Sequence, residues 1–153
     1  MNLIIRKMRE QDLEPLHALL SDPETMRSLE PPSTREQTEA FLRAGMSEKP
    51  PVYTAEADGT FIGYVIFHAY EEDTTELGWV LLPEYRGRGY AAALTEQMIR
   101  KAAEEGKKPV IECDPEQKIS AHIAMKSGLV RAESRDGLDV YRLPEREGKR
   151  RNL

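Results

Sequence analysis

The chain has 153 residues, of which 39% are hydrophobic and 32% are charged, and its formal net charge is −5. This length and composition predict one globular domain over residues 1–143, with a charged tail over 144–153. The negative charge argues against a nucleic-acid-binding protein, and no apolar run approaches the roughly 18–20 residues of a membrane span. A charged N-terminus and a single cysteine, Cys113, predict a cytoplasmic protein with neither a disulfide nor a metal site.

The first half of the chain indicates one strand, two helices and a three-stranded meander. Leucines at helical spacing stop before Asp22-Pro23, and Ser33 with Glu36 matches a capping box that opens the next helix. Asp58-Gly59 separates two β-rich runs and is a strong signal for a two-residue hairpin. The expected elements are a strand over 2–7, helices over 13–21 and 34–46, and strands over 52–57, 60–69 and 74–82.

The second half indicates two more helices and three more strands. Ala91, Leu94 and Met98 recur at helical spacing in a helix that Gly106 ends, and Asp114 with Pro115 matches an N-cap and first helical position. The expected elements are helices over 91–105 and 115–127, a strand over 109–113, and a hairpin of 129–133 with 138–143. The order β-α-α-β-β-β-α-β-α-β-β predicts an α/β fold with a mixed (α+β) sheet and helices on both faces.

The most informative segment is ELGWVLLPEYRGRGYAA at residues 76–92. An apolar strand leads into an Arg/Gly-rich loop, and the loop leads directly into a helix. Glycines allow the backbone to approach an anion, and the N–H groups at a helix N-terminus bind phosphate. The segment therefore predicts a site for a phosphate-bearing cofactor.

Two other interpretations of this loop stay open. Gly87 to Ala92 also fits the G-x-G-x-x-A pattern of a Rossmann dinucleotide site, although four residues separate the strand from the loop and antiparallel signals precede it. Only about 40 residues follow Asp114, which leaves little room for a second nucleotide-binding half. The other interpretation is a solvated Arg/Gly turn that binds nothing.

The same stretch resembles the acyl-CoA-binding motif of the GNAT (Gcn5-related) N-acetyltransferases. Arg86 to Ala91 fits the pattern [QR]-x-x-G-x-[GA], and the lead-in looks closest to the ribosomal-protein alanine acetyltransferase branch. A second segment, Gln117 to Leu129, resembles the element N-x-x-S…K-x-G-F of that family, with Gln117 in place of Asn and Leu129 in place of Phe. The resemblance covers residues 2–143 and implies a GNAT-like fold with a splayed central sheet.

The resemblance also implies how acetyl-CoA is bound. The strand before the loop would separate from its neighbour and expose backbone groups to pantetheine and the thioester, while the loop N–H groups would bind the pyrophosphate. Cofactor-binding residues implied in this way are Val80, Leu81, Leu82, Arg86, Gly87, Arg88, Gly89, Tyr90, Ala91, Gln117, Ser120 and Lys126.

Acyl transfer from a thioester to an amine needs a base for the amine and benefits from a proton for the leaving thiolate. Glu76 and Glu112 stand where family members carry a strand glutamate, and a carboxylate in an apolar cleft has the raised pKa that suits a base. Many relatives protonate the thiolate with a tyrosine whose position is Ala124 here, so Ser120 is the best substitute by its place in the motif. We expect direct transfer, because Cys113 has no evident catalytic partner.

The expected partners are acetyl-CoA and a primary amine, which can be a small molecule or a protein N-terminus, on a monomer or homodimer. Family members bind the acceptor between segments that correspond to residues 22–34 and 133–140. Acidic residues there could attract a cationic amine, and Met26, Pro31 and Pro32 could line a pocket or shape a turn. The missing tyrosine leaves a non-catalytic CoA-binding sensor as an alternative function.

Overall fold

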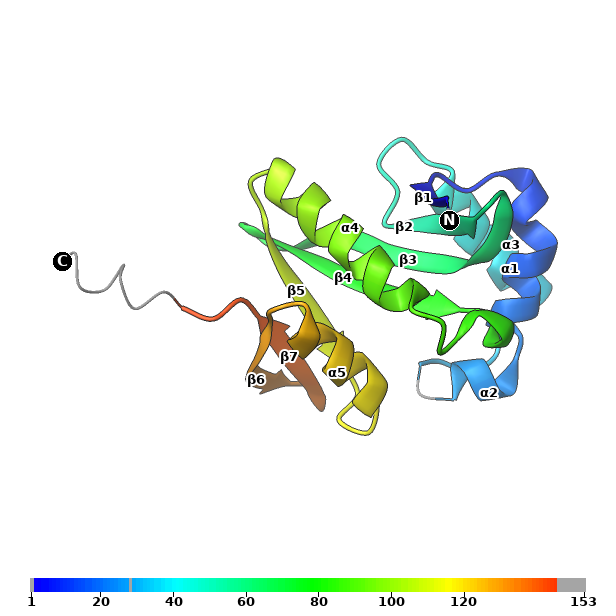
Figure 1. Cartoon of the computed structure of the whole chain (residues 1–153). Coiled ribbons are helices and arrows are strands. Elements are labelled where there is room, and N and C mark those ends of the chain that lie inside the picture. Colours follow the sequence, from blue (N-terminus) through cyan, green and yellow to red (C-terminus); the bar gives the residue numbers. More distant parts are fainter. Residues whose placement is uncertain (1, 28, 146–153) are drawn as a thin grey trace.

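The computed structural model describes residues 2–27 and 29–145 (Figure 1). The helices are α1 (Leu13–Leu20), α2 (Pro23–Met26), α3 (Arg35–Gly45), α4 (Tyr90–Glu104) and α5 (Lys118–Lys126), with short 3-10 turns at η1 (Glu10–Asp12) and η2 (Pro83–Tyr85). The strands are β1 (Leu3–Arg6), β2 (Val52–Ala57), β3 (Thr60–Glu71), β4 (Thr74–Leu81), β5 (Lys108–Cys113), β6 (Val130–Arg135) and β7 (Leu138–Arg142). The tail expected over 144–153 lies, after its first two residues, outside the described residues.

The seven strands form one mixed sheet in the order β1-β2-β3-β4-β5-β7-β6. Every neighbouring pair is antiparallel except β4 and β5, which are parallel because α4 connects them as a crossover. The mixed-sheet prediction is confirmed, and the Rossmann alternative is wrong, because a Rossmann fold needs a mostly parallel sheet. The hairpin turns at Asp58-Gly59 and Asp136-Gly137 are also confirmed, with positive φ at all four residues.

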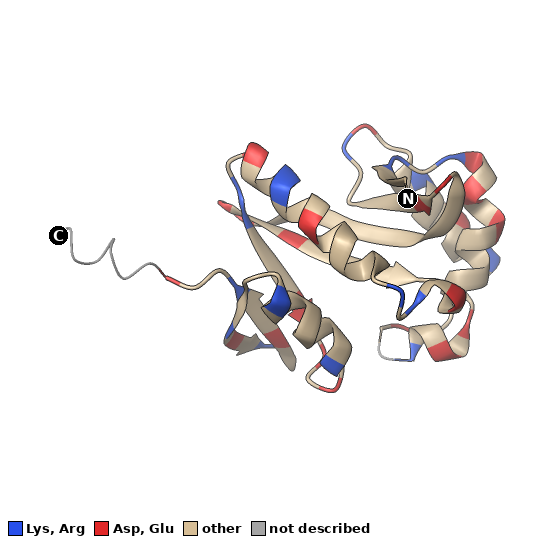
Figure 2. Cartoon of the chain, viewed as in Figure 1, with Lys and Arg blue, Asp and Glu red and all other residues tan. Residues whose placement is uncertain are grey.

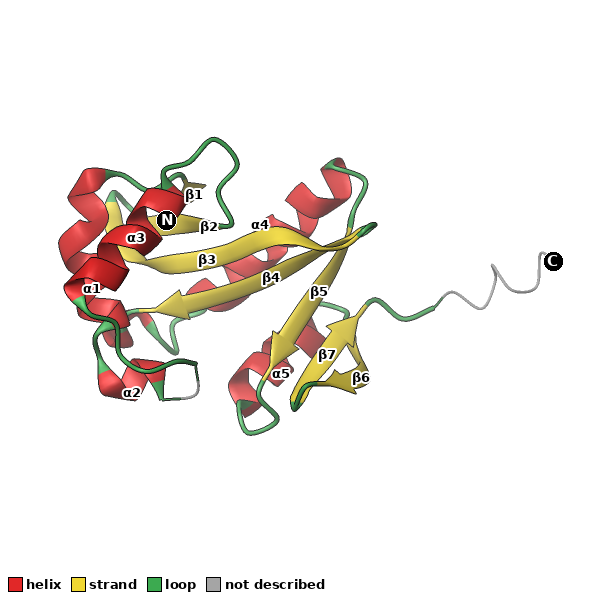
Figure 3. Ribbon diagram, turned by 180° about the vertical axis from the view of Figure 1, so that it is seen from behind, coloured by secondary structure: helices red, strands yellow, loops and turns green. Residues whose placement is uncertain are grey.

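The sheet opens between its two halves. β4 and β5 pair only from Thr74 opposite Lys108 to Glu76 opposite Val110, whereas β4 continues to Leu81 and β5 to Cys113. Beyond these pairs the two strands separate, as Figures 1 and 3 show. The splayed sheet that the sequence led us to expect is therefore present, and the backbone of Leu77–Leu81 has no strand partner on its β5 side.

Alternation along β4 assigns its two faces to two hydrophobic clusters. Leu77 and Leu81 pack with Leu94 and Met98 of α4 in one cluster, which also contains Ala124 of α5. Val80 packs on the other face, against a cluster built from α1, α2 and α3. Figure 3 shows α1 and α3 in front of the sheet and α4 behind it. By the same alternation Glu76 lies on the α1/α3 face.

Two predicted helix starts are wrong, and the sequence prediction lacks the short helix α2. The capping box consists of Thr34 and Gln37, one residue later than predicted, because the Ser33 N–H donates to the Leu20 carbonyl oxygen (2.8 Å) and so stays with the preceding turn. Pro23 is the first residue of α2, and Asp22 is the N-cap of this helix, because its side chain accepts from the Thr25 N–H (3.2 Å).

The other incorrect start is that of α5, which begins at Lys118 instead of directly after Asp114. Asp114 Oδ1 accepts from the Glu116 N–H and the Asp114 carbonyl oxygen accepts from the Gln117 N–H, both at 2.8 Å. These bonds form a turn that delays the helix, because an aspartate side chain competes with the backbone for local donors. None of the helices in the described parts of the chain has the length and apolar composition to cross a membrane.

Candidate active site

The loop that follows β4 presents an open helix N-terminus. Gly87 and Gly89 have φ of 71° and 86°, and Gly89 is the N-cap of α4. The first bond of the helix runs from the Ala93 N–H to the Gly89 carbonyl oxygen (3.2 Å), so the N–H groups of residues 90–92 precede the helical ladder. A β-carbon on either glycine would find no atom within 4 Å. The loop therefore offers donors and space to an anion.

Both arginines of the loop are held by other parts of the protein. Arg86 donates from Nε to the Leu81 carbonyl oxygen (3.0 Å) and from Nη2 to Thr25 Oγ1 of α2 (2.8 Å). Arg88 donates to the Glu84 carbonyl oxygen (3.0 Å) and lies 5.5 Å from the ring centres of Tyr85 and Tyr90. Figure 2 shows basic positions in this loop. Both residues are exposed, but the guanidinium of Arg86 is turned toward β4 and α2, whereas that of Arg88 stays over the tyrosines of the loop.

Glu76 lies where β4 and β5 begin to separate. Its side chain is 19% exposed, and its Oε1 is 3.1 Å from Nε2 of His68, which faces it across the β3–β4 pair. Burial raises the pKa of Glu76, and the nearby Glu112 carboxylate raises it further, while His68 opposes both effects. The structure thus brings the two predicted bases, Glu76 and Glu112, into one electrostatic neighbourhood.

Glu112 has a different environment from Glu76. Its Oε2 accepts a hydrogen bond from the Tyr70 hydroxyl, whose oxygen accepts from Arg135 Nη1 (2.9 Å). Burial and the bond to Glu112 raise the pKa of Tyr70 to about 12, so Tyr70 stays a proton donor to the carboxylate near neutral pH. One oxygen of Glu112 therefore already accepts a hydrogen bond from a phenol, whereas Glu76 is paired with the imidazole of His68.

The predicted residues of α5 are spread along that helix. Gln117 is its N-cap, and the Gln117 Oε1 accepts from the Asp114 N–H (3.3 Å). Ser120 is half-buried in the first turn, whereas Lys126 is exposed at the last residue, roughly 9 Å farther along the axis by helical rise. Ala124 is 0% exposed and belongs to the core, so its methyl group faces the sheet.

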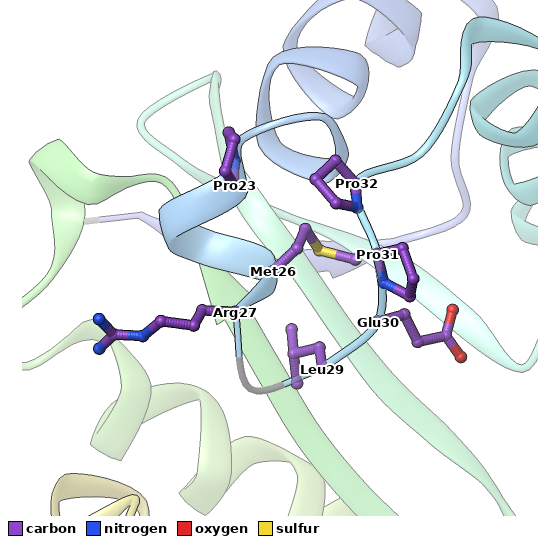
Figure 4. Close-up of a pocket in the computed structure, with 7 residues that line it drawn as sticks. All are labelled: Pro23, Met26, Arg27, Leu29, Glu30, Pro31 and Pro32. Atoms are coloured by element: carbon purple, nitrogen blue, oxygen red, sulfur yellow. The ribbon is translucent and has the colours of Figure 1, made fainter.

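An open hollow lies beside α2 and has a volume of about 400 Å³ (Figure 4). Its lining residues are Pro23, Met26, Arg27, Leu29, Glu30, Pro31 and Pro32. The three residues expected to line a pocket, Met26, Pro31 and Pro32, are among them. Burial raises the pKa of Tyr64 on β3 to about 12, and the charge of Glu30 adds to this effect. Met26 of the hollow packs in the same cluster as Tyr64 and Val80, so the hollow adjoins the end of the sheet face that carries these two residues.

The acidic residues of the last hairpin are less available than the sequence indicated. Glu133 accepts from Arg135 (2.8 Å) and from Arg142 (3.0 Å), and Arg142 also pairs with Glu71 (2.9 Å). No group of three His, Cys, Asp or Glu side chains in the described residues is placed to hold a metal ion.

Sequence reasoning missed His68 and Tyr70, the partners of the two glutamates. The signal was present in part, because a hairpin turn near residues 72–73 brings residues 68–70 close to residues 75–77. It was not sufficient, since Tyr70 lies at a register shift between Ala69 and Glu71. Without that bulge, Ala69 would face Glu76, and His68 would point to the other face.

Comparison with known proteins places this arrangement in a family. The model of the acetyltransferase (GNAT) domain matches residues 2–130. An uncharacterized N-acetyltransferase of Bacillus subtilis, YnaD, is 29% identical in an alignment of 136 residues that covers 84% of this chain and 79% of that protein.

Solved structures agree with this match. A GNAT-family acetyltransferase from Bacillus anthracis superposes with a TM-score of 0.81 at 26% identity, over 93% of each chain. Spermidine N-acetyltransferase from Vibrio cholerae, solved with CoA and spermine, has a TM-score of 0.75 at 20% identity over 92% of each chain, a likeness of fold. The chain belongs to the GNAT family of acetyltransferases, which transfer an acyl group from acetyl-CoA to an amine.

Proposed function

We propose that the protein acetylates a primary amine by direct transfer from acetyl-CoA, with Glu76 as the general base. The observation that carries this proposal is the place of Glu76 at the last paired position of β4 and β5, beyond which the two strands separate. An amine that reaches the thioester through this opening passes the carboxylate. The raised pKa of Glu76 suits proton removal, because a base of higher pKa accepts a proton more readily.

Acetyl-CoA would lie along the free edge of β4 and across the N-terminus of α4. Gly87 and Gly89 leave space for the pyrophosphate, and N–H groups from Arg88 to Ala91 would bind it. Backbone groups near Val80–Leu82, where the chain has no strand partner on its β5 side, would bind pantetheine and polarise the thioester carbonyl. Gln117, Ser120 and Lys126 would contact the cofactor from α5. Arg86 would position the loop and would not bind the phosphate itself, since its guanidinium donates to the Leu81 carbonyl oxygen and to Thr25 Oγ1.

The acceptor is proposed to be a primary amine on a small molecule or a protein N-terminus. The hollow beside α2 combines apolar walls with one carboxylate, Glu30, and one guanidinium, Arg27. Such a lining fits an acceptor molecule that has an apolar part and a cationic amine. A polyamine is one member of this class, and the Vibrio cholerae structural neighbour was solved with spermine. For this acetylation of a primary amine we propose a cytoplasmic protein that works as a monomer or a homodimer.

The experiment compares wild type with Glu76→Gln, Glu112→Gln and the double variant, using CoA-thiol release across a panel of amines. Glu76→Gln should lower kcat by about 10²–10⁴-fold, the usual contribution of a general base, with CoA affinity by calorimetry unchanged within about twofold. Glu112→Gln should cost less than about tenfold, and exposed Glu96→Gln on α4 serves as the matched control.

Three outcomes would contradict parts of the proposal. Full activity of Glu76→Gln excludes that residue as the base. A larger loss in Glu112→Gln reverses the roles of the two glutamates. Tight CoA binding without turnover of any amine in the panel would leave the protein as a CoA-binding sensor.

A further inference from the structure

His68 connects the half-buried Glu76 carboxylate to the solvent. The two residues are Cα partners across β3 and β4, and Nε2 of His68 is 3.1 Å from Oε1 of Glu76. The side chain of His68 is 40% exposed, whereas that of Glu76 is 19% exposed. An imidazole thus stands between a carboxylate inside the site and water outside it.

The second ring nitrogen of His68 indicates where a proton lies. Nδ1 is 3.0 Å from the Ala69 carbonyl oxygen, and because a carbonyl oxygen only accepts, Nδ1 must carry a hydrogen in this arrangement. In a neutral imidazole Nε2 then has a lone pair, which repels an ionised carboxylate oxygen. The contact between Nε2 and Oε1 is therefore favourable when one proton lies between the two atoms.

Acetylation of an amine produces such a proton. An ammonium ion, R–NH₃⁺, and acetyl-CoA give R–NH–acetyl, CoA–SH and one H⁺. The nitrogen loses two protons and the thiolate gains one, so one proton leaves the site in each turnover. The acceptor has to lie next to Glu76 for the transfer. The solvent contact of the His68–Glu76 pair is then made by the exposed part of the His68 ring.

We propose that His68 is a positioning residue that acts through Glu76 and carries the released proton to solvent. The proposal rests on the function of Glu76 as the base. The amine N–H bond breaks as an O–H bond forms on Glu76, then that O–H bond breaks as an N–H bond forms on Nε2 of His68. The N–H bond on Nε2 of the exposed imidazolium then breaks as its proton passes to water, which restores the neutral ring with its hydrogen on Nδ1 for another turnover.

Glu112 does not offer the same route. One of its oxygens accepts from the Tyr70 hydroxyl, and Arg135 donates to Tyr70. Tyr70 cannot take over a proton from Glu112, because the pKa of Tyr70 is raised to about 12 and its hydroxyl keeps its own proton near neutral pH. His68, in contrast, both contacts Glu76 and has a side chain that is 40% exposed.

Chemical rescue tests the proposal. His68→Ala removes the imidazole and leaves space for a small base, whereas His68→Gln fills the space with a group that cannot carry a proton. Both should lower kcat about tenfold or more, with the KM for acetyl-CoA unchanged within about twofold. Added imidazole should restore most of the kcat of His68→Ala, in proportion to its neutral fraction, and should not affect His68→Gln. The exposed His122→Ala is the matched control and should behave as wild type.

Glu76 variants separate this proposal from the assignment of the base. In a Glu76→Gln background, His68→Ala should cause no further loss and imidazole no rescue, because the relay has no donor. Unchanged kcat in His68→Ala, or a loss that imidazole does not restore, overturns the role of His68 while Glu76→Gln alone still reports on the base. Full activity of Glu76→Gln would instead overturn the proposed function itself.

Discussion

Arg86 donates from Nη2 to Thr25 Oγ1 at 2.8 Å, and this bond ties the loop ahead of α4 to the short helix α2. The Thr25 hydroxyl donates in turn to Asp22 Oδ2 (2.6 Å), while Nε of Arg86 binds the Leu81 carbonyl oxygen (3.0 Å). One chain of hydrogen bonds therefore connects the proposed pyrophosphate loop, the end of β4 and the rim of the hollow in Figure 4.

Thr25→Val removes the hydroxyl of this chain and nearly preserves the shape of the side chain. We expect the KM for the amine to rise about 3- to 10-fold, because the neighbouring Pro23, Met26 and Arg27 line the hollow and a bond to a charged group contributes roughly 1.5–3 kcal/mol at most. CoA affinity should change less than twofold. Thr60→Val, at the exposed start of β3, is the control. Steady-state kinetics with calorimetry checks this, and an equal loss of CoA affinity would contradict it.

Gly89→Ala should weaken CoA binding about tenfold or more. The added β-carbon meets no protein atom within 4 Å, so any steric conflict arises with a ligand above the loop. The substitution also places alanine at φ 86°, which costs roughly 1–2 kcal/mol of stability.

Gly106→Ala is the matched control for that strain. Gly106 has φ 72° and equally open surroundings, but lies beyond the other end of α4. Thermal unfolding should show similar losses of stability for both variants, and calorimetry should show reduced CoA affinity only for Gly89→Ala. Equal CoA affinity in the two variants would show that the loop is a turn without a binding role.

The pH dependence of stability should reveal the ion pairs of Glu71. Hydrogen bonds from Arg142, and to a smaller extent from Arg135, lower the pKa of Glu71 from 4.5 to about 2. Because the folded-state pKa is depressed, these contacts stabilise the fold above pH 4.5, and the stabilisation is lost as the pH falls from 4.5 through about 2. Glu71→Gln should therefore lower Tm near neutral pH, by an amount that shrinks toward pH 2. Glu72→Gln, at the adjacent exposed position, should show no such trend.

The parts of the site that the sequence predicts are those encoded by local chemistry. Asp58-Gly59 and the glycines of the loop adopt the positive φ that their residue types favour, so the meander and the helix N-terminus follow from short segments. Glu76 could be placed on a strand because it lies in a short apolar, β-rich segment. Its face and its partner could not, since these depend on the bulge at Tyr70, where one extra residue changes which side chains meet.

The helix boundaries illustrate the same limit. Ser33 and Thr34 are both favoured N-cap residue types, and the choice between them is made by a bond from the Ser33 N–H to the end of α1, which is a tertiary contact. Likewise, Arg86 stands in the loop motif, yet its side chain binds Thr25, 61 positions earlier in the chain. Contacts between distant segments decide these details, and spacing along the sequence does not report them.

Ser120→Ala tests whether a residue protonates the leaving thiolate. Ser120 is half-buried in the first turn of α5, and Ala124, where relatives were expected to carry the tyrosine, is fully buried in the core. A serine hydroxyl is a poor acid, and a CoA thiol with a pKa near that of a free cysteine can be protonated by water. We expect kcat to fall less than about fivefold, with Ser127→Ala at the C-terminal end of α5 as the control. A loss near 10²-fold with unchanged CoA affinity would instead assign Ser120 the role of the acid, because that is the lower limit for groups that transfer a proton in the transition state.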